Sequence, residues 1–166
     1  TNCIVLRVDE NDNTYGNCNL NKIDFSKYDI VVISDYNKGF LTESDIEEIS
    51  QNHPITFLDT KKILGDWCKN ITFIKINEFE FERTKHRLDN DLTSKMIVTL
   101  GPKGAKYQDK TYSVPKVEIK DTSGAGDTFV SGLVVKYAET QNITEAIKFA
   151  NNCATQVVQK KGVSIV

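Results

Sequence analysis

Small residues and a carboxylate stand together between residues 121 and 128, in the order Asp-Thr-Ser-Gly-Ala-Gly-Asp-Thr. The apolar run that follows predicts a helix over about residues 124–139, which begins inside this stretch. The first amides of a helix have no intrahelical acceptors and lie at the positive end of the helix dipole, so they attract phosphate. Gly124 and Gly126 would let the backbone approach a bulky ligand. Asp127 would lie in the first turn, where a carboxylate can accept the proton of an attacking hydroxyl.

The same residues have a simpler interpretation. Gly-x-Gly is common in loops, and the helix dipole alone favours an aspartate in a first turn. The eight residues taken by themselves leave a phosphate site and an ordinary helix start equally open.

The composition restricts the classes of partner. Lys and Arg number 21 and Asp and Glu number 23, which gives a net charge of −2. This balance argues against a protein that binds nucleic acid or an anionic membrane. The apolar runs are far shorter than the roughly 18 residues of a transmembrane helix, and we see no signal peptide pattern. The cysteines are widely spaced without a Cys-x-x-Cys pair, which predicts reduced thiols and a cytoplasmic location.

Short apolar runs that end in polar clusters recur along the chain and predict an open, mostly parallel α/β sheet flanked by helices. Ligands of such a sheet lie outside the carboxyl ends of its strands. We expect strands at residues 3–8, 28–34, 55–58, 71–75 and 96–100, an antiparallel hairpin of 105–108 with 111–114, and helices over 43–51 and 143–159, with Gly162 stopping the last helix. No linker or repeat divides the chain, so we expect residues 1–166 to form one domain.

Residues 121–129 resemble, without a gap, the second signature of the ribokinase-like (PfkB) sugar kinases, Asp-Thr-x-Gly-Ala-Gly-Asp-Thr-Phe. The resemblance implies ATP-dependent phosphorylation of a sugar or sugar phosphate. It implies that the backbone of Gly124, Ala125 and Gly126 forms the anion hole for the transferred phosphate and that Asp127 is the catalytic base. It also allows a monovalent cation near Asp121 and Ser123.

Three further motifs follow the order of this family. Asn77 and Glu80 resemble its Asn-x-x-Glu motif, which implies contact with Mg²⁺ and phosphate; the alternative is a helix start with an acidic first turn. Thr99, Gly101 and Gly104 resemble its Thr-x-Gly-x-x-Gly turn, which contacts the nucleotide; the alternative is a plain turn. The resemblance places Asn151 in the adenine pocket, and the alternative there is a partly exposed helix residue.

One motif is more specific within the family. Asp35-Tyr36-x-Lys38-Gly39 is similar to the Asp-Tyr-x-Lys-Gly of the heptose-7-phosphate kinase branch, which serves ADP-heptose synthesis. Lys61 lies where that branch has Asp-Pro-Lys, although here threonine replaces the proline. The branch implies Asp35, Lys38 and Lys61 as acceptor contacts, and a lysine can hold a phosphate as a point charge. Solvated surface lysines are the alternative for Lys38 and Lys61.

The resemblance runs from about Val5 to Gly162 and covers only the C-terminal part of such a kinase domain. The N-terminal section, with most of the family's sugar contacts, has no counterpart, and residues 81–95 are too few for the family's long helix. Apolar strand edges would then be exposed. We therefore expect either an omitted N-terminal portion or a homodimer that covers the edge.

Three hypotheses about function follow. The first is a kinase that acts on a sugar or sugar phosphate, with heptose 7-phosphate as the favoured acceptor. The second is a nucleotide-binding remnant of such a kinase that no longer catalyses transfer. The third is a family member that acts on ribose, fructose or a nucleoside. A screen of acceptors separates them.

Overall fold

The computed structural model describes residues 16, 18–162 and 164, and the predicted strand at residues 3–8 lies outside them. The chain forms two compact units. Of the described residues, one unit comprises 16, 18–99 and 106–110, and the other comprises 100–105, 111–162 and 164. The expectation of one domain stays a prediction. We call the two units the strand unit and the helix unit.

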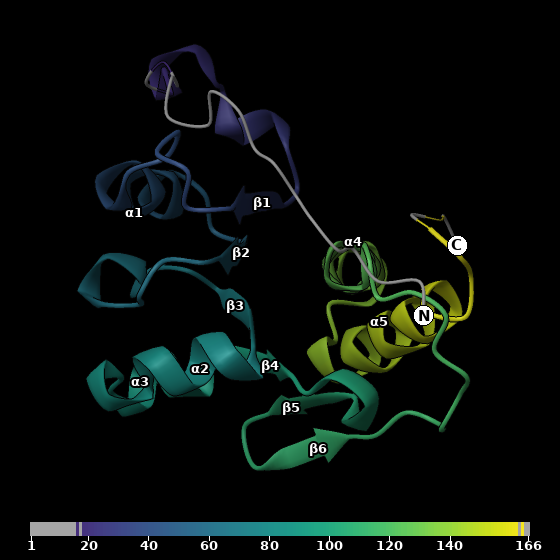
Figure 1. Cartoon of the computed structure of the whole chain (residues 1–166). Coiled ribbons are helices and arrows are strands. Elements are labelled where there is room, and N and C mark those ends of the chain that lie inside the picture. The colour runs from purple at the N-terminus through teal and green to yellow at the C-terminus, as the bar shows by residue number, and fades with distance from the viewer. Residues whose placement is uncertain (1–15, 17, 163, 165–166) are drawn as a thin grey trace. The chain divides into compact units, whose positions relative to one another are not determined.

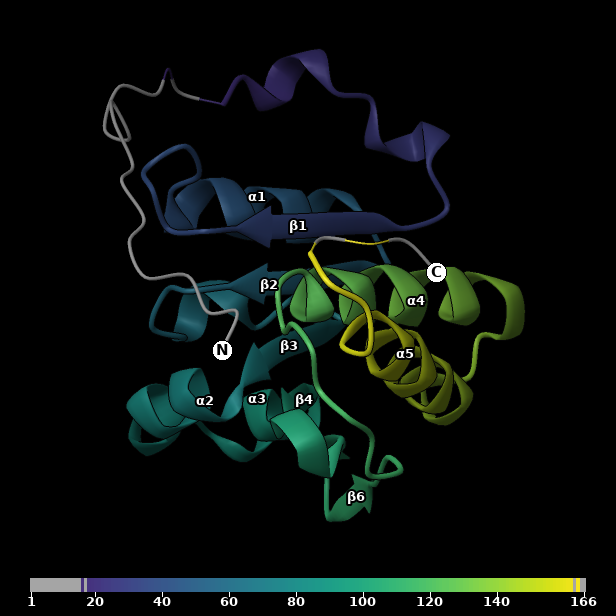
Figure 2. The same cartoon turned by 45° about the vertical axis from the view of Figure 1, so that its right-hand side comes forward.

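Four parallel strands form the strand unit, namely β1 (Val31–Asp35), β2 (Thr56–Thr60), β3 (Phe73–Asn77) and β4 (Met96–Thr99). They lie side by side in chain order in Figures 1 and 2, and the hairpin strands β5 and β6 follow β4 in the order of the sheet. The register aligns Asp35 with Thr60, Asp59 with Lys75, and Asn77 with Thr99. The carboxyl ends of the strands therefore bring polar side chains into one row, as the sequence predicted.

The apolar runs make the core of the strand unit. Buried side chains of α1 (Glu43–Asn52) and of β2, β3 and β4 contribute to this core; they include Ile46, Phe57, Leu58, Ile74, Ile76 and Ile97. The first strand, β1, is less buried than the other three parallel strands. Val32 is 43% exposed, so β1 is not buried on both faces. Burial on both faces requires a covering layer on each face of the strand, and β1 is the outermost strand of the described sheet.

Three helices of the strand unit begin at side-chain caps. Thr42 caps α1 with a capping box, and Asn77 does the same for α2 (Glu78–Thr84). Asp89 caps α3 (Asn90–Ser94), and a 3-10 turn (Lys85–Arg87) lies between α2 and α3. Two short helices thus occupy residues 78–94, which agrees with the expectation that this segment cannot form one long helix.

The helix unit contains α4 (Ala125–Thr140) and α5 (Ile143–Val157), which lie side by side in both views (Figures 1 and 2). Gly132 makes the close approach possible, because a Cβ there would lie 3.2 Å from Cys153 Sγ. Asn142 caps α5. Gly162 does not stop this helix, contrary to the prediction, because α5 already ends at Val157.

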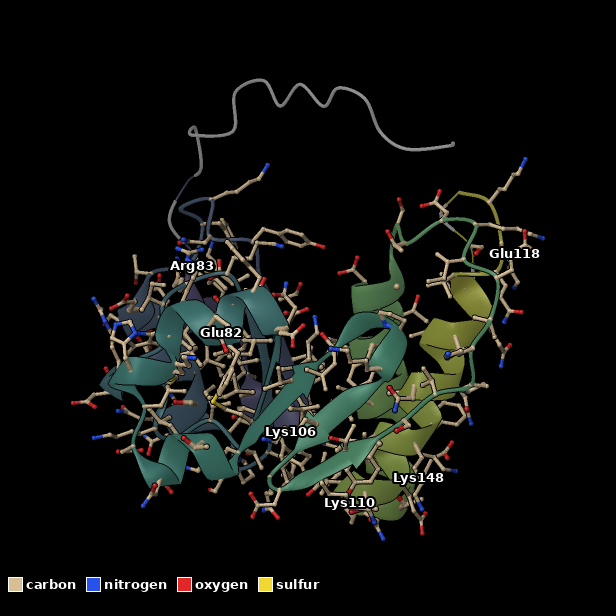
Figure 3. All side chains as sticks on the ribbon, turned by 60° about the horizontal axis from the view of Figure 1, so that its bottom comes forward. Glu82, Arg83, Lys106, Lys110, Glu118 and Lys148 are labelled. Carbon is tan, nitrogen blue, oxygen red and sulfur yellow. The ribbon has the colours of Figure 1, made fainter. Side chains whose placement is uncertain are left out.

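The hairpin consists of β5 (Ala105–Tyr107) and β6 (Lys110–Tyr112), and its turn falls on Gln108 and Asp109, one residue earlier than predicted. Gln108 takes a positive φ of 53° there, which fixes the turn. Figure 3 labels two exposed lysines of the hairpin, Lys106 and Lys110. Within the described part of the chain, no helix has the length and apolar character needed to traverse a membrane.

Candidate active site

The predicted phosphate-binding stretch lies at the N-terminus of a long helix. α4 begins at Ala125, Gly124 is its N-cap, and Asp127 lies in the first turn, as the sequence predicted. Gly124 has a φ of 76°, a left-handed conformation that an L side chain rarely takes. This glycine therefore turns the chain into the helix at a point where most other residues would be strained.

The N-terminus of α4 differs from those of the other described α-helices. Side-chain oxygens of Thr42, Asn77, Asp89 and Asn142 accept first-turn amides of α1, α2, α3 and α5. Gly124 supplies no such oxygen. The Ala125 amide donates to the Thr122 carbonyl at 3.2 Å, whereas the amides of Gly124 and Gly126 have no acceptor within the described residues. These two amides can therefore bind an external anion.

Asp121 fixes the loop that leads into α4. Its Oδ1 accepts the amide of Ser123 at 2.8 Å, and its Oδ2 accepts the amide of Gly162 at 3.1 Å. These hydrogen bonds, led by that of the Ser123 amide, hold the pKa of the Asp121 carboxyl below its usual range. Each oxygen retains a second lone pair, so the residue still fits a role in holding a monovalent cation.

Two predicted nucleotide residues meet at Tyr112. Asn151 is 6% exposed, and its Nδ2 donates to the backbone oxygen of Tyr112 at 2.7 Å. Gly104 has a φ of 94°, and a Cβ there would lie 2.1 Å from the same oxygen. Gly101, with a φ of 57°, opens the preceding 3-10 turn, and the Leu100 amide closes it by donating to Gly104 O at 2.7 Å. These glycines are thus required by the turn itself.

Asn77 and Glu80 serve as helix caps in the strand unit. Asn77 Oδ1 accepts the Glu80 amide, and Glu80 Oε2 accepts the Asn77 amide, both at 2.8 Å. Thr99, which is aligned with Asn77, donates from Oγ1 to Ile76 O at 3.4 Å. The alternative interpretation of a capped helix start is therefore correct for the local structure. Glu80 Oε1 takes no part in the cap and lies 3.8 Å from Lys61 Nζ.

Glu80 fits a magnesium site of the usual kind. Mg²⁺ keeps several waters and takes one or two protein carboxylates together with substrate phosphates. Within the described residues no group of three or more His, Cys, Asp or Glu side chains is arranged to hold a metal. One carboxylate oxygen of Glu80, in a side chain that is 11% exposed, is enough for a contact of this kind.

The three predicted acceptor residues lie at the ends of β1 and β2. Asp35 is buried, and its oxygens accept the Asn37 amide at 3.0 Å and the Thr60 hydroxyl at 2.7 Å. Lys61 is exposed; its Nζ lies 5.4 Å from the centre of the Tyr36 ring and 3.8 Å from Glu80 Oε1. Lys38 is half-buried in the loop after β1. The structure therefore brings Asp35, Lys61 and Glu80 into one neighbourhood.

Two lysines with little-exposed side chains escaped the sequence prediction. Lys62 lies 3.4 Å from Asp35 Oδ2, and its side chain is 9% exposed. Lys75 bonds Asp59 at 3.1 Å from the neighbouring strand. The strand period could have indicated Lys75, because it stands between Ile74 and Ile76 in a strand buried on both faces. Nothing in the sequence distinguishes Lys62 from Lys61, because the two lysines differ only in the direction that each side chain takes in the fold.

Comparison with known proteins shows the family of the chain. Residues 45–166 match the model of the pfkB family carbohydrate kinases. The bifunctional protein HldE of a Nitratiruptor species is 32% identical over 82% of this chain, and the match spans 33% of that relative. HldE of Helicobacter acinonychis is 29% identical over 95% of this chain and 41% of the relative. The chain thus spans well under half the length of both.

Solved ribokinases share the fold. A ribokinase of Thermotoga maritima has a TM-score of 0.66 at 22% identity, and the match covers 83% of this chain and 52% of that one. Arabidopsis thaliana ribokinase, solved with ribose and ATP, has a TM-score of 0.64 at 23% identity, with 81% and 51% covered. The described fold is therefore that of about half a ribokinase.

Proposed function

Because this chain belongs to the pfkB family of carbohydrate kinases, we propose that it transfers a phosphoryl group from ATP to a hydroxyl of a sugar or sugar phosphate. The observation that carries the proposal is the N-terminus of α4. It lacks a side-chain cap, leaves two glycine amides without an acceptor in the described chain, and has a carboxylate in its first turn. Phosphoryl transfer depends mainly on positioning and charge stabilisation, which such a helix end supplies.

Asp127 is the base in this proposal, and the backbone from Gly124 to Gly126 is the anion hole. The Gly124 and Gly126 amides donate to the transferred phosphate, while the Ala125 amide bonds Thr122 and shapes the turn. Asp127 accepts the proton of the acceptor hydroxyl as that oxygen attacks. Its place in the first turn keeps the carboxylate beside the amides that bind the phosphate.

The nucleotide has a set of expected contacts. The bond to Tyr112 fixes the Asn151 amide group, and Asn151 Oδ1, which has no partner in the described chain, is left to accept an amino group such as that of adenine. Thr99, Gly101 and Gly104 are assigned to the turn beside the nucleotide. Glu80 and Asn77 are assigned to the side of Mg²⁺ and phosphate. When bound, Mg²⁺ neutralises charge on the phosphates.

The favoured acceptor is a heptose 7-phosphate. The support is the likeness to two HldE proteins and the exposed Lys61 at the end of β2, with Lys38 in the neighbouring loop. A lysine ammonium suits the phosphate of such an acceptor. We assign Asp35 an indirect role, because hydrogen bonds within the chain already occupy its carboxylate. In this role Asp35 holds the loop after β1 in place. A cytoplasmic location and pairing of two copies remain part of the proposal.

The test is a transfer assay on the full-length gene product with heptose 7-phosphate, ribose, fructose and a nucleoside as acceptors. We expect ADP formation with heptose 7-phosphate above all the others. Preference for ribose, fructose or a nucleoside would replace this acceptor within the same family. ATP binding in a calorimeter without transfer to any acceptor would instead identify a nucleotide-binding remnant. Size measurement on the same sample reports whether two copies pair.

A further inference from the structure

Residues 60–62 at the end of β2 point in alternating directions. Thr60 and Lys62 turn toward Asp35 of the neighbouring strand β1, whereas Lys61 turns toward Tyr36 and Glu80. The exposures of the side chains agree with this alternation, because Lys62 is 9% exposed and Lys61 is 53% exposed. Two consecutive lysines therefore have different surroundings.

Asp35 is the centre of a buried polar network. Its Oδ2 accepts the Thr60 hydroxyl at 2.7 Å and pairs with Lys62 Nζ at 3.4 Å, while its Oδ1 accepts the Asn37 amide at 3.0 Å. Lys62 Nζ also donates to Asn37 Oδ1 at 2.9 Å. The two charges are only 4% and 9% exposed, so each depends on the other for compensation.

The network fixes the backbone on both sides. Asn37 takes a positive φ of 55°, and two bonds hold it there, one through its amide and one through its side chain. The Lys61 amide donates to the Asp35 carbonyl at 3.1 Å, and the Lys62 amide donates to Thr60 Oγ1 at 3.0 Å. Tyr36 and Lys61, the exposed residues of the two segments, are therefore carried by backbone that the buried pair holds in place.

We propose that Asp35 and Lys62 are positioning residues, which hold the loop after β1 and the Lys61 segment in the arrangement that receives the acceptor. The role rests on the proposed function, since it assumes that Lys61 contacts the acceptor. Lys62 itself touches no substrate, and its effect passes through Asp35 and Asn37. Threonine at position 60 belongs to the same network, since its hydroxyl both donates to Asp35 and accepts from the Lys62 amide.

The test compares three lysine variants of the full-length gene product by two independent measurements. Lys62→Met removes the buried ammonium, Lys61→Met removes the exposed one, and Lys106→Met is a matched control on the hairpin, where Figure 3 labels this exposed lysine. Hydrogen exchange of a peptide that covers residues 36–39 reports the loop. Steady-state kinetics with heptose 7-phosphate and ATP report the two KM values.

Lys62→Met is expected to speed exchange in residues 36–39 and to raise the KM for heptose 7-phosphate by about tenfold or more, with the KM for ATP unchanged. Lys61→Met is expected to raise the same KM without faster exchange, and Lys106→Met to change neither. If Lys62→Met does not fold, Asp35→Asn/Lys62→Met replaces it, because that double variant leaves no unpaired buried charge and still lacks the Lys62 bond to Asn37.

Unchanged exchange in the Lys62 variant would overturn the positioning role, and so would faster exchange with an unchanged acceptor KM. If the proposed function itself is wrong, the transfer assay gives a different result. In that case the unaltered protein transfers phosphate to no acceptor, and the positioning role falls with it even if exchange responds as expected.

Discussion

Gly104 and Asn151 meet at one atom, the backbone oxygen of Tyr112. Asn151 donates to this oxygen at 2.7 Å, and Gly104 approaches it so closely that a Cβ would lie 2.1 Å away. The resemblance assigned both residues to the nucleotide. The structure adds a reason internal to the fold, because the turn before β5, the end of β6 and the buried side of α5 depend on the same carbonyl.

Substitution of Gly104 by alanine should therefore destabilise the protein strongly. The new Cβ would clash with backbone, which cannot move aside as a flexible side chain does, and φ is positive as well. We expect a loss of about 3 kcal/mol or more in the free energy of unfolding, measured by urea denaturation. Gly101→Ala is the matched control. Its φ is also positive but its Cβ meets nothing within 4 Å, so only about 1–2 kcal/mol should be lost.

Gly124→Ala tests the entry into α4. The left-handed backbone at Gly124 should cost an alanine about 1–2 kcal/mol of stability. The same change should weaken ATP binding in a calorimeter, because the strain is relieved by moving the amides that face the phosphate. Gly126→Ala is the control for stability. Residue 126 lies within the helix, where alanine is the better helix former by about 0.5–1 kcal/mol. Equal stability of the two variants would contradict the left-handed turn.

Acid should loosen the loop before α4 through Asp121. Hydrogen bonds from the Ser123 and Gly162 amides lower the pKa of this carboxyl in the folded protein. A lowered folded pKa means that the stabilisation is fully present above the unfolded pKa and is lost as pH falls through the folded one. Asp121→Asn should therefore lose stability near neutral pH and show a smaller further loss on acidification. Thermal unfolding followed across the carboxylate range measures this, and a parallel pH profile for both proteins would refute it.

The sequence was most informative where side-chain period and capping act locally. The four parallel strands, the helix after residue 42 and the start of α4 were all predicted within a few residues, because local patterns determine them. The sequence was least informative where the direction of a side chain in the fold decides its surroundings. Lys61 and Lys62 look alike in the chain, yet one is exposed and the other is buried against Asp35. The prediction that Gly162 stops the last helix also failed, because α5 already ends at Val157.

The central claim is that Asp127 takes the proton of the attacking hydroxyl, and turnover of Asp127→Asn measures it most directly. Because general base catalysis contributes roughly 10²–10⁴-fold, we expect kcat to fall by at least about a hundredfold. ATP affinity by calorimetry should stay unchanged, since the amides at the start of α4 remain in place. Asp109→Asn, at the exposed hairpin turn, is the control and should keep full activity. Turnover of Asp127→Asn equal to that of the unaltered protein would contradict the account.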